Sequence, residues 1–422
     1  MKRSTTLRLA AMTAASAIVL AACSSGSDDN DDAEATSDVP KGDGTLIVGS
    51  LLPQTGSLAF LGPPEFAGVD LAIKDINAAG GVLGKDVEGV KADSGDTDSG
   101  IAPAETDKLL KAKSDVIVGA ASSGVSMTVI DKIMSAGVVQ YSPANTSTEF
   151  DEPPYDKADL YFRTAPSDIL QGAVMSNLLV EDGRQNVAIL SRQDAYGNTL
   201  AEQIKKGLEA AGSKVSTTAF YGEKATSFDS QIDQVAASKP DAIVLIAFDE
   251  TKKIIPGLIG KGVGPQQVPT YFVDGNTADY SKEGFASALK GVKGTIPGAE
   301  ATEDFKKALL TVNPDLTDYS YAAESYDAVV TSALAAIAAG SDSGEAIASQ
   351  LIDVTREGEK CTTFEECAKL LEDDPKTDID YDGKSGPIEF GKTGSPTAAS
   401  IGIYEYNDKG TYAATKYIAG EI

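Results

Sequence analysis

The stretch Leu46–Gly84 reads LIVGSLLPQTGSLAFLGPPEFAGVDLAIKDINAAGGVLG. Its opening run, Leu46 to Leu52, is apolar enough for a buried strand, and the polar loop Gln54-Thr55-Gly56-Ser57 follows. A helix is predicted to start near Pro64 and to end at Gly80-Gly81, where glycine allows the backbone to leave the helix. Its apolar residues recur at the spacing of one helix face: Phe66, Val69, Ile73 and Ile76. A strand, a polar loop and a helix start in this order build ligand sites at the carboxyl edge of an open α/β sheet.

From Thr45 onward, short β-rich runs alternate with helical periods. The predicted strands are Asp115–Gly119, Gly137–Tyr141, Asn186–Leu190, Ala242–Ala247 and Val268–Val273. The predicted helices between them include Asp168–Glu181, Thr199–Ala211 and Phe228–Ser238. This alternation predicts an α/β fold of βαβ units, with largely parallel sheets covered by helices on both faces. The strands are too many for one sheet, so two such lobes are expected.

The order of elements over Leu46–Gly84 resembles that of the branched-chain amino acid (Leu/Ile/Val-type) solute-binding proteins of ABC importers, and the resemblance covers nearly all of Thr45–Ile422. It implies the type I periplasmic binding protein fold, with two Rossmann-like lobes and a hinge of three crossings near Thr164, Pro297 and Ala399. Lobe one would comprise residues 45–164 and 298–398, including a helix through Tyr319–Ala339. Lobe two would comprise residues 165–297 and 399–422, completed by the strands Ile401–Tyr406 and Tyr412–Tyr417.

The N-terminus has the pattern of an export signal. Residues 1–22 combine basic residues, a short apolar run and small residues at the end. Leu20-Ala21-Ala22-Cys23 resembles a bacterial lipobox, which implies cleavage before Cys23 and a lipid on that residue, whereas the alternative is an ordinary signal with an incidental cysteine. Residues 23–44 are expected to form a lipid anchor and a disordered tether, because the segment after Cys23 holds hardly any large apolar residue.

Composition excludes some classes of partner. The chain has 422 residues, 42% of them hydrophobic, so it can bury a sizeable core, and its formal charge is −27. Nucleic acid and anionic lipid surfaces are therefore poor partners on electrostatic grounds. No long apolar run follows the N-terminal one, so no transmembrane bundle is expected.

Cys361 and Cys367 are an even pair in an exported chain, for which a disulfide is the default. Thr363 and Glu366 fit a capping box, which places Cys361 just before a helix and Cys367 in its first turn. A zinc site is disfavoured, because the chain has no histidine to complete one.

The run Asp378-Ile379-Asp380-Tyr381-Asp382-Gly383 with Glu389 matches the spacing of an EF-hand calcium loop. Prolines at 375 and 387 and glycines at 391 and 394 are incompatible with its flanking helices and loop. The resembling family has a similar turn there without calcium, so we interpret the match as coincidental and expect no metal.

Two predicted strand ends carry hydroxyl-rich loops that suit a carboxylate. Ser122 and Ser123 precede a helix, whose free N–H groups and dipole favour an anion, and Asn145 and Thr146 follow the next strand. The resemblance implies that Ser123 and Thr146 hold the α-carboxylate of a ligand, with Ser122 and Asn145 beside them. Taken alone, the same residues could simply be helix or turn caps.

Asp274 follows a predicted strand of lobe two, where an acidic residue of the family, usually glutamate, pairs with the α-ammonium group of the ligand. The alternative is an aspartate that caps the turn before Gly275. By the same resemblance Tyr196 packs on the ligand, Phe248 replaces a frequent tyrosine, and Leu61 replaces a frequent aromatic residue. Tyr196 and Phe248 could instead be ordinary core residues.

Absence of histidine removes Ser-His-Asp and Cys-His catalysis, and no P-loop or nucleophile elbow is present. We therefore expect no enzyme and no cofactor. The resemblance implies a monomeric, extracytoplasmic lipoprotein that captures an amino acid or related polar solute and delivers it to an ABC permease and ATPase. The alternatives are a ligand sensor on the same fold, or a receptor for a short amide, urea or aromatic acid.

Overall fold

The computed structural model describes residues 42–374 and 377–422. The predicted signal segment, Cys23 and most of the predicted tether lie outside the described residues. Residues 42–44, the end of that tether, contact the folded body: the Gly44 N–H donates to the Asp342 carboxylate (2.8 Å), and Lys113 pairs with Asp43 (3.0 Å).

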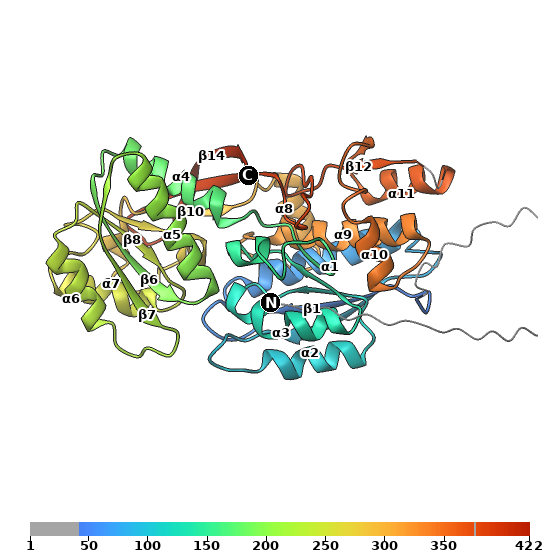
Figure 1. Cartoon of the computed structure of the whole chain (residues 1–422), viewed down its shortest axis with the longest axis horizontal. Coiled ribbons are helices and arrows are strands. Elements are labelled where there is room, and N and C mark those ends of the chain that lie inside the picture. The colour runs from blue at the N-terminus through green and yellow to red at the C-terminus, as the bar shows by residue number, and fades with distance from the viewer. Residues whose placement is uncertain (1–41, 375–376) are drawn as a thin grey trace, which may run out of the picture. The chain divides into compact units, whose positions relative to one another are not determined.

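The first sheet has five parallel strands in the order β2-β1-β3-β4-β5. The strand labelled β1 in Figure 1 belongs to this sheet. Its strands are β1 (Ile47–Leu52), β2 (Glu88–Asp93), β3 (Val116–Gly119), β4 (Val139–Ser142) and β5 (Tyr161–Arg163). The helical elements of this half are α1 (Gly62–Ala78), α2 (Ala102–Lys111), α3 (Ser123–Ser135), η1 (Thr148–Asp151), α8 (Glu303–Leu309), α9 (Ala322–Ala339), α10 (Gly344–Gln350) and α11 (Phe364–Asp373). A small two-stranded sheet pairs β11 (Glu359–Cys361) with β12 (Ile379–Tyr381).

The second sheet has seven strands in the order β14-β13-β10-β9-β8-β6-β7. They are β6 (Asn186–Gln193), β7 (Lys214–Gly222), β8 (Ala242–Ile246), β9 (Thr270–Phe272), β10 (Lys293–Pro297), β13 (Ala398–Tyr406) and β14 (Tyr412–Glu421). The helices that follow or precede them are α4 (Asp168–Glu181), α5 (Ala195–Ala210), α6 (Asp229–Ser238), α7 (Thr251–Gly260), η2 (Asp274–Asn276) and η3 (Ala286–Leu289). β13 runs antiparallel to β10. β14 runs antiparallel to β13, because the short loop between them can join only antiparallel neighbours.

The predicted α/β class with largely parallel sheets is confirmed, and most element boundaries differ by a few residues. The strand predicted over Val268–Val273 is shorter because Pro269 has no N–H to give to a neighbour. At the other end of that strand, the Val273 N–H donates to the Asn276 side chain at 2.9 Å.

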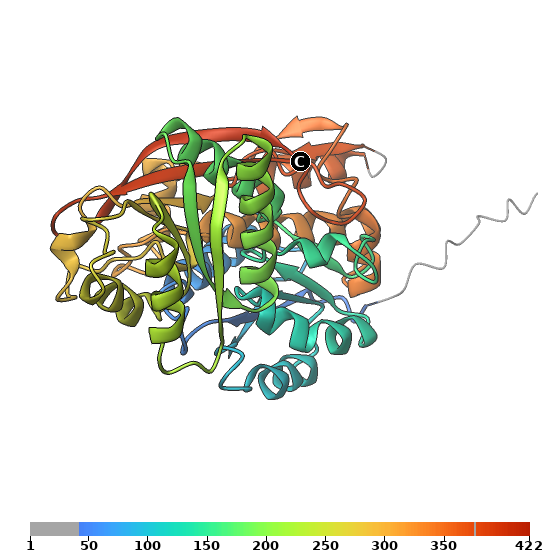
Figure 2. The ribbon, with the colours of Figure 1, turned by 60° about the vertical axis from the view of Figure 1, so that its left-hand side comes forward.

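The chain passes between the two sheets three times. It leaves the first sheet between β5 and α4, returns between β10 and α8, and leaves again where β13 begins. Figure 2 shows the β13–β14 hairpin (red) as a long ribbon along one edge of the second sheet. One hydrophobic cluster joins residues after β1, β3 and β4 to the second sheet, so the two halves pack against each other.

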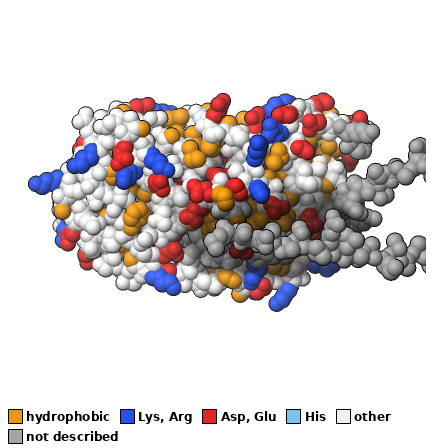
Figure 3. Space-filling model, in the orientation of Figure 1, with side chains coloured by type: hydrophobic (Ala, Val, Ile, Leu, Met, Phe, Trp, Pro, Cys, Tyr) orange, Lys and Arg blue, Asp and Glu red, His pale blue; other side chains and the backbone are white. Residues whose placement is uncertain are grey.

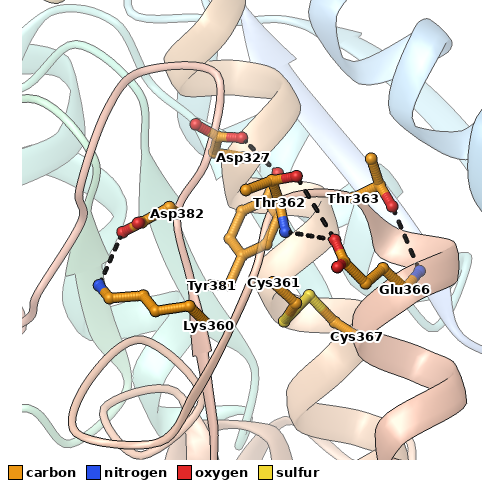
Figure 4. Close-up of a disulfide and its surroundings, with 9 residues drawn as sticks. All are labelled: Asp327, Lys360, Cys361, Thr362, Thr363, Glu366, Cys367, Tyr381 and Asp382. Atoms are coloured by element: carbon orange, nitrogen blue, oxygen red, sulfur yellow. Dashed lines mark hydrogen bonds and ion pairs between the residues drawn. A yellow bond between two sulfur atoms is a disulfide. The ribbon is translucent and has the colours of Figure 1, made fainter.

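Cys361 and Cys367 form a disulfide between β11 and the first turns of α11 (Figure 4). Thr363 caps α11 by accepting the Glu366 N–H at 3.2 Å. The Glu366 carboxylate accepts the N–H of Thr362 at 3.0 Å, one residue earlier than a regular capping box requires.

The EF-hand-like run is bound to the buried Asp327 of α9. The Tyr381 hydroxyl and the Lys384 N–H donate to one carboxylate oxygen, at 2.8 and 3.0 Å. The Ser385 N–H and hydroxyl donate to the other oxygen, at 2.7 and 2.6 Å. The turn Asp382–Ser385 thus serves to dock the segment after α11 onto α9.

Among the described residues, no helix is both long and apolar enough to cross a membrane. On the face that Figure 3 shows, hydrophobic side chains form only small separate areas among acidic and basic ones.

Candidate ligand site

The loop after β3 presents the start of α3. Ser122 is the N-cap residue, and its hydroxyl accepts the Val125 N–H at 3.4 Å. Ser123 is the first helical residue, so its backbone N–H has no acceptor within the helix. The helix dipole adds partial positive charge at the same point. This end of α3 can therefore receive a carboxylate.

Asn145, in the loop after β4, connects this loop to the loop after β3. Its amide nitrogen donates to the carbonyls of Ala120 and Ala121 at 3.0 and 2.9 Å. The Tyr161 hydroxyl donates to its side-chain oxygen at 3.0 Å. Because both polar ends of the buried Asn145 side chain are used in this way, the residue positions the loops.

Thr146 lies next to Asp168, at the start of α4. The Asp168 N–H donates to the Thr146 carbonyl at 2.7 Å, across the first crossing between the sheets. The fully buried Arg163 supports this loop: its guanidinium donates to the Ser147 carbonyl at 2.8 Å and pairs with Asp151 at 2.5 Å.

Asp274 begins η2, directly after β9 and Val273, and is only 6% exposed. The hydroxyls of Tyr196 and Tyr321 donate to its two carboxylate oxygens at 2.6 and 2.7 Å. The Gln171 amide donates at 2.9 Å to the oxygen that Tyr196 also contacts. All three donors are neutral, and among the described residues no lysine or arginine pairs with this carboxylate.

Tyr196 and Phe248 form a stacked aromatic wall, with ring centroids 5.6 Å apart and planes 18° apart. The Arg192 guanidinium lies 3.6 Å from the centre of the Phe248 ring. Arg192 is itself held by ion pairs to Asp194 (2.5 Å) and Glu250 (2.9 Å). The phenylalanine ring is therefore fixed in place by a stacked cation.

These groups meet in a small cavity between the ends of the two sheets. Its volume is about 10 Å³, enough for about one water molecule. The lining residues are Leu58, Leu61, Ala121, Ser122, Ser123, Ala144, Tyr196, Phe248, Asp274 and Gly275. Most of the lining is apolar, Asp274 is its one acidic residue, and it includes neither lysine nor arginine.

Six of the predicted site residues line this cavity: Leu61, Ser122, Ser123, Tyr196, Phe248 and Asp274. Asn145 and Thr146 lie behind it, in the contacts described above. The sequence analysis missed Leu58 of the lining, as well as Tyr321 and Gln171, which hold the Asp274 carboxylate. Leu58 stands in the polar loop after β1, and Tyr321 stands just before a helix from a distant part of the chain, so neither carried a recognisable signal.

Asp168 is a second, fully buried acid near Asp274. Burial, together with the negative charge of Asp274, raises the pKa of Asp168 to about 8. The Thr199 hydroxyl donates to its carboxylate at 2.9 Å. At neutral pH this group is therefore mostly protonated, which leaves Asp274 as the main negative charge of the region.

Comparison with known proteins agrees with this geometry. The sequence profile of the periplasmic binding protein family matches residues 45–366. The chain belongs to that family. Membership of the periplasmic binding protein family implies an extracytoplasmic location.

Two relatives are similar over most of the periplasmic binding protein. The leucine-, isoleucine-, valine-, threonine- and alanine-binding protein of Pseudomonas aeruginosa is 28% identical over 63% of this chain and 70% of its own. The chemotactic signal transduction system substrate-binding protein BasB of Halobacterium salinarum is 25% identical over 86% of this chain and 88% of its own.

Solved structures share the fold. The branched-chain amino acid transporter substrate-binding protein LivJ of Streptococcus pneumoniae, in complex with isoleucine, has a TM-score of 0.71 and 20% identity over 90% of this chain and 100% of its own. A solute-binding protein of an ABC transporter from R. palustris, in complex with benzoate, has a TM-score of 0.69 and 19% identity over 90% of this chain and 98% of its own.

Proposed function

We propose that this periplasmic binding protein captures an α-amino acid with an apolar side chain and delivers it to an ABC permease and ATPase. The observation that carries the proposal is Asp274, a buried carboxylate in the cavity wall whose hydrogen-bond donors are all neutral. A ligand ammonium group would supply the missing positive charge. An anionic ligand such as benzoate would instead place a second negative charge beside the first.

The opposite wall suits the other end of an amino acid. Ser122 and Ser123 stand at the N-terminus of α3, where backbone N–H groups and the helix dipole favour a carboxylate. Leu58, Leu61 and Phe248 would surround the side chain, so we expect an aliphatic one.

The cavity has no room for an amino acid while the sheets are this close, since its volume is about 10 Å³. Binding therefore requires the two halves to separate and then to close on the ligand, with the three crossings as hinges. For this motion we take residues 45–164 and 298–398 as one lobe, and residues 165–297 and 399–422 as the other.

The test is a thermal-shift screen of the standard L-amino acids, short amides, urea and benzoates, followed by calorimetry on the best ligand. We expect an aliphatic amino acid to bind, and Asp274→Asn to lose about 2–5 kcal/mol of its binding free energy, because the ammonium is left unpaired. Asp304→Asn, a change at an exposed residue of α8, is the matched control and should bind like the wild type. Equal affinity in Asp274→Asn and wild type, or stabilisation by benzoates alone, would overturn the assignment.

Membrane attachment is part of the proposal and rests on the N-terminal sequence alone. Cys23 would carry a lipid, and residues 24–44 would link it to the body. Replacing Cys23 with serine should move the exported protein from the membrane fraction to the soluble fraction, as blotting of the two fractions would reveal. Continued retention in the membrane fraction would contradict the anchor.

A second candidate is a sensor that signals the presence of the same ligand, because BasB, a relative over 86% of the chain, belongs by name to a chemotactic system. Uptake of labelled ligand distinguishes the two. A strain that lacks this protein should lose uptake if the protein serves an importer, whereas unchanged uptake with a lost behavioural response would favour the sensor.

A further inference from the structure

A second cavity, of about 550 Å³, lies beside the second and third crossings and away from the ligand cavity. One wall is the segment Pro297–Ala301 after β10, and another is the segment 317–321 before α9. The β13–β14 hairpin closes it on the third side. Segments associated with both sheets therefore line this space, which we call the hinge cavity.

Tyrosine rings of the hairpin form one side of the hinge cavity. Tyr404 meets Tyr412 and Tyr417 nearly at right angles, with ring centroids 5.6 and 6.3 Å apart and planes at 78° in both pairs. The hydroxyls of Tyr404 and Tyr417 are 3.1 Å apart, which joins the two strands of the hairpin. Ring faces set at right angles are the usual surroundings of an organic cation in proteins.

Glu324, in the first turn of α9, lines the same cavity and is 4% exposed. Its carboxylate faces the crossing: a Cβ added to Gly298, also in the lining, would lie 2.5 Å from Glu324 Oε1. Among the described residues, no other residue donates a hydrogen bond to this carboxylate, and none forms an ion pair with it. A buried carboxylate without a partner is costly unless a cation joins it.

Most of the other charged residues of the hinge cavity are acidic. Asp318 accepts the Tyr412 hydroxyl at 2.8 Å, and Asp279 and Glu300 also line the space. Lys306, the basic residue of the lining, pairs with Glu303 at 2.9 Å. Acidic residues therefore outnumber basic ones in the lining, and the tyrosine rings add aromatic surface for apolar groups.

We propose that the hinge cavity binds a small organic ammonium ion, with its charge beside Glu324 and Asp318 and its alkyl groups against Tyr404, Tyr412 and Tyr417. The site is distinct from the ligand cavity and goes beyond the proposed function. Tyr321 connects the two cavities: it lines the hinge cavity, and its hydroxyl donates to Asp274 in the wall of the ligand cavity.

Choline is the probe, because its charge does not depend on pH, and 3,3-dimethylbutan-1-ol is its neutral counterpart of the same shape. Calorimetry and thermal shift are run at constant ionic strength and pH 8.5. We expect choline to bind and to raise the melting temperature, and the neutral alcohol to do neither. Glu324→Gln should weaken choline binding by about tenfold or more.

Two further variants keep the result interpretable. Asp274→Asn should bind choline like the wild type, because the charge it removes belongs to the ligand cavity. Tyr417→Leu, a change in a half-buried residue of the hairpin, should weaken choline binding even if Glu324→Gln fails to fold. No choline binding by the wild type, equal binding of the neutral alcohol, or loss of binding in Asp274→Asn but not in Glu324→Gln would overturn the proposal.

A pH series adds an independent readout. Burial raises the pKa of Glu324 to about 8, so its carboxylate is mostly neutral at pH 6 and mostly charged at pH 8.5. Choline affinity should therefore rise between these values in the wild type and stay constant in Glu324→Gln. Other titratable groups surround Glu324. Those that interact with it electrostatically are Glu65 of α1, Tyr321 just before α9, Asp327 within α9 and Tyr404 of β13. Those in the rest of the cavity lining include Asp318, Glu300 and Lys306. A pH-independent affinity in the wild type would count against Glu324 as the site of the charge.

Discussion

Asp168, at the start of α4, and Asp274, shortly after β9, have different roles. The Asp274 carboxylate accepts hydroxyl and amide donors on both of its oxygens, whereas Asp168 is buried with the Thr199 hydroxyl as its donor. Two carboxylates in one buried region are disfavoured when both are ionised, so the more deeply buried one keeps its proton. This difference preserves a single negative charge for the ligand.

The raised pKa of Asp168 predicts a pH-dependent stability. Between the unfolded pKa of 3.8 and the folded value of about 8, the folded state binds more protons than the unfolded state. The free energy of unfolding should therefore decrease as the pH rises through this window. Urea denaturation at pH 5, 6, 7 and 8 measures the slope, and Asp168→Asn should reduce it. An equal slope in both proteins would contradict the burial of a protonated Asp168.

The polar residues after predicted strands, Ser122, Ser123 and Asp274, do line the cavity, whereas Leu61, Tyr196 and Phe248 were expected from the family resemblance. Asp274 and Ser123 follow apolar runs that can only be buried strands, so their place at a sheet edge is readable from the pattern. Tyr321 could not be found in this way, because its contact with Asp274 joins segments 47 residues apart. The ligand contacts of these residues remain a prediction.

At the scale of elements, α1 and α9 pack closely through glycine. A Cβ on Gly68 of α1 would lie 2.2 Å from the Ala322 carbonyl of α9, which is too close for any side chain. The apolar spacing of α1 was visible in the sequence, but the identity of its partner was not. Helix α9 is almost entirely buried because it packs on α1 and also holds, through Asp327, the turn before residue 387.

Gly68→Ala should destabilise the protein, by about 1–3 kcal/mol for overpacking of a close contact. Gly260→Ala is the control: Gly260 is the last residue of α7, and a Cβ there meets nothing within 4 Å. That change should be neutral or stabilising by up to about 1 kcal/mol, since alanine is the better helix former. Urea denaturation of both variants measures their free energies of unfolding. Equal changes in the two variants would mean that the α1–α9 contact is looser than described.

At the scale of the whole molecule, the ligand cavity exists only because three crossings bring two sheet edges together. Contacts between the halves at its margin include the Thr97 hydroxyl with the Glu223 carboxylate, and Tyr321 with Asp274. Side chains of the hydrophobic cluster described above also join the halves, and among the described residues the two sheets share no strand. The molecule can thus open and close without unfolding either half.

If the two halves open and close, the protein should change its size in solution when the ligand binds. Addition of the best amino acid from the screen should reduce the radius of gyration measured by small-angle X-ray scattering, because the ligand bridges the two halves. The same addition to Asp274→Asn should have little effect at equal concentration. A radius of gyration that is the same with and without ligand in the wild type would contradict hinge closure.

The class of fold, the strand and helix order and the polar strand ends can be read from the residues alone, because hydrophobic periodicity and turn residues are local properties. Which of those strand ends meet depends on the packing of distant segments. It placed Tyr321 and Gln171 on Asp274, turned Asn145 inward between two loops, and formed the hinge cavity behind the crossings. These contacts depend on how two separately folded sheets are brought together by the crossings, and no local pattern along Leu46–Gly84 or elsewhere encodes that distance.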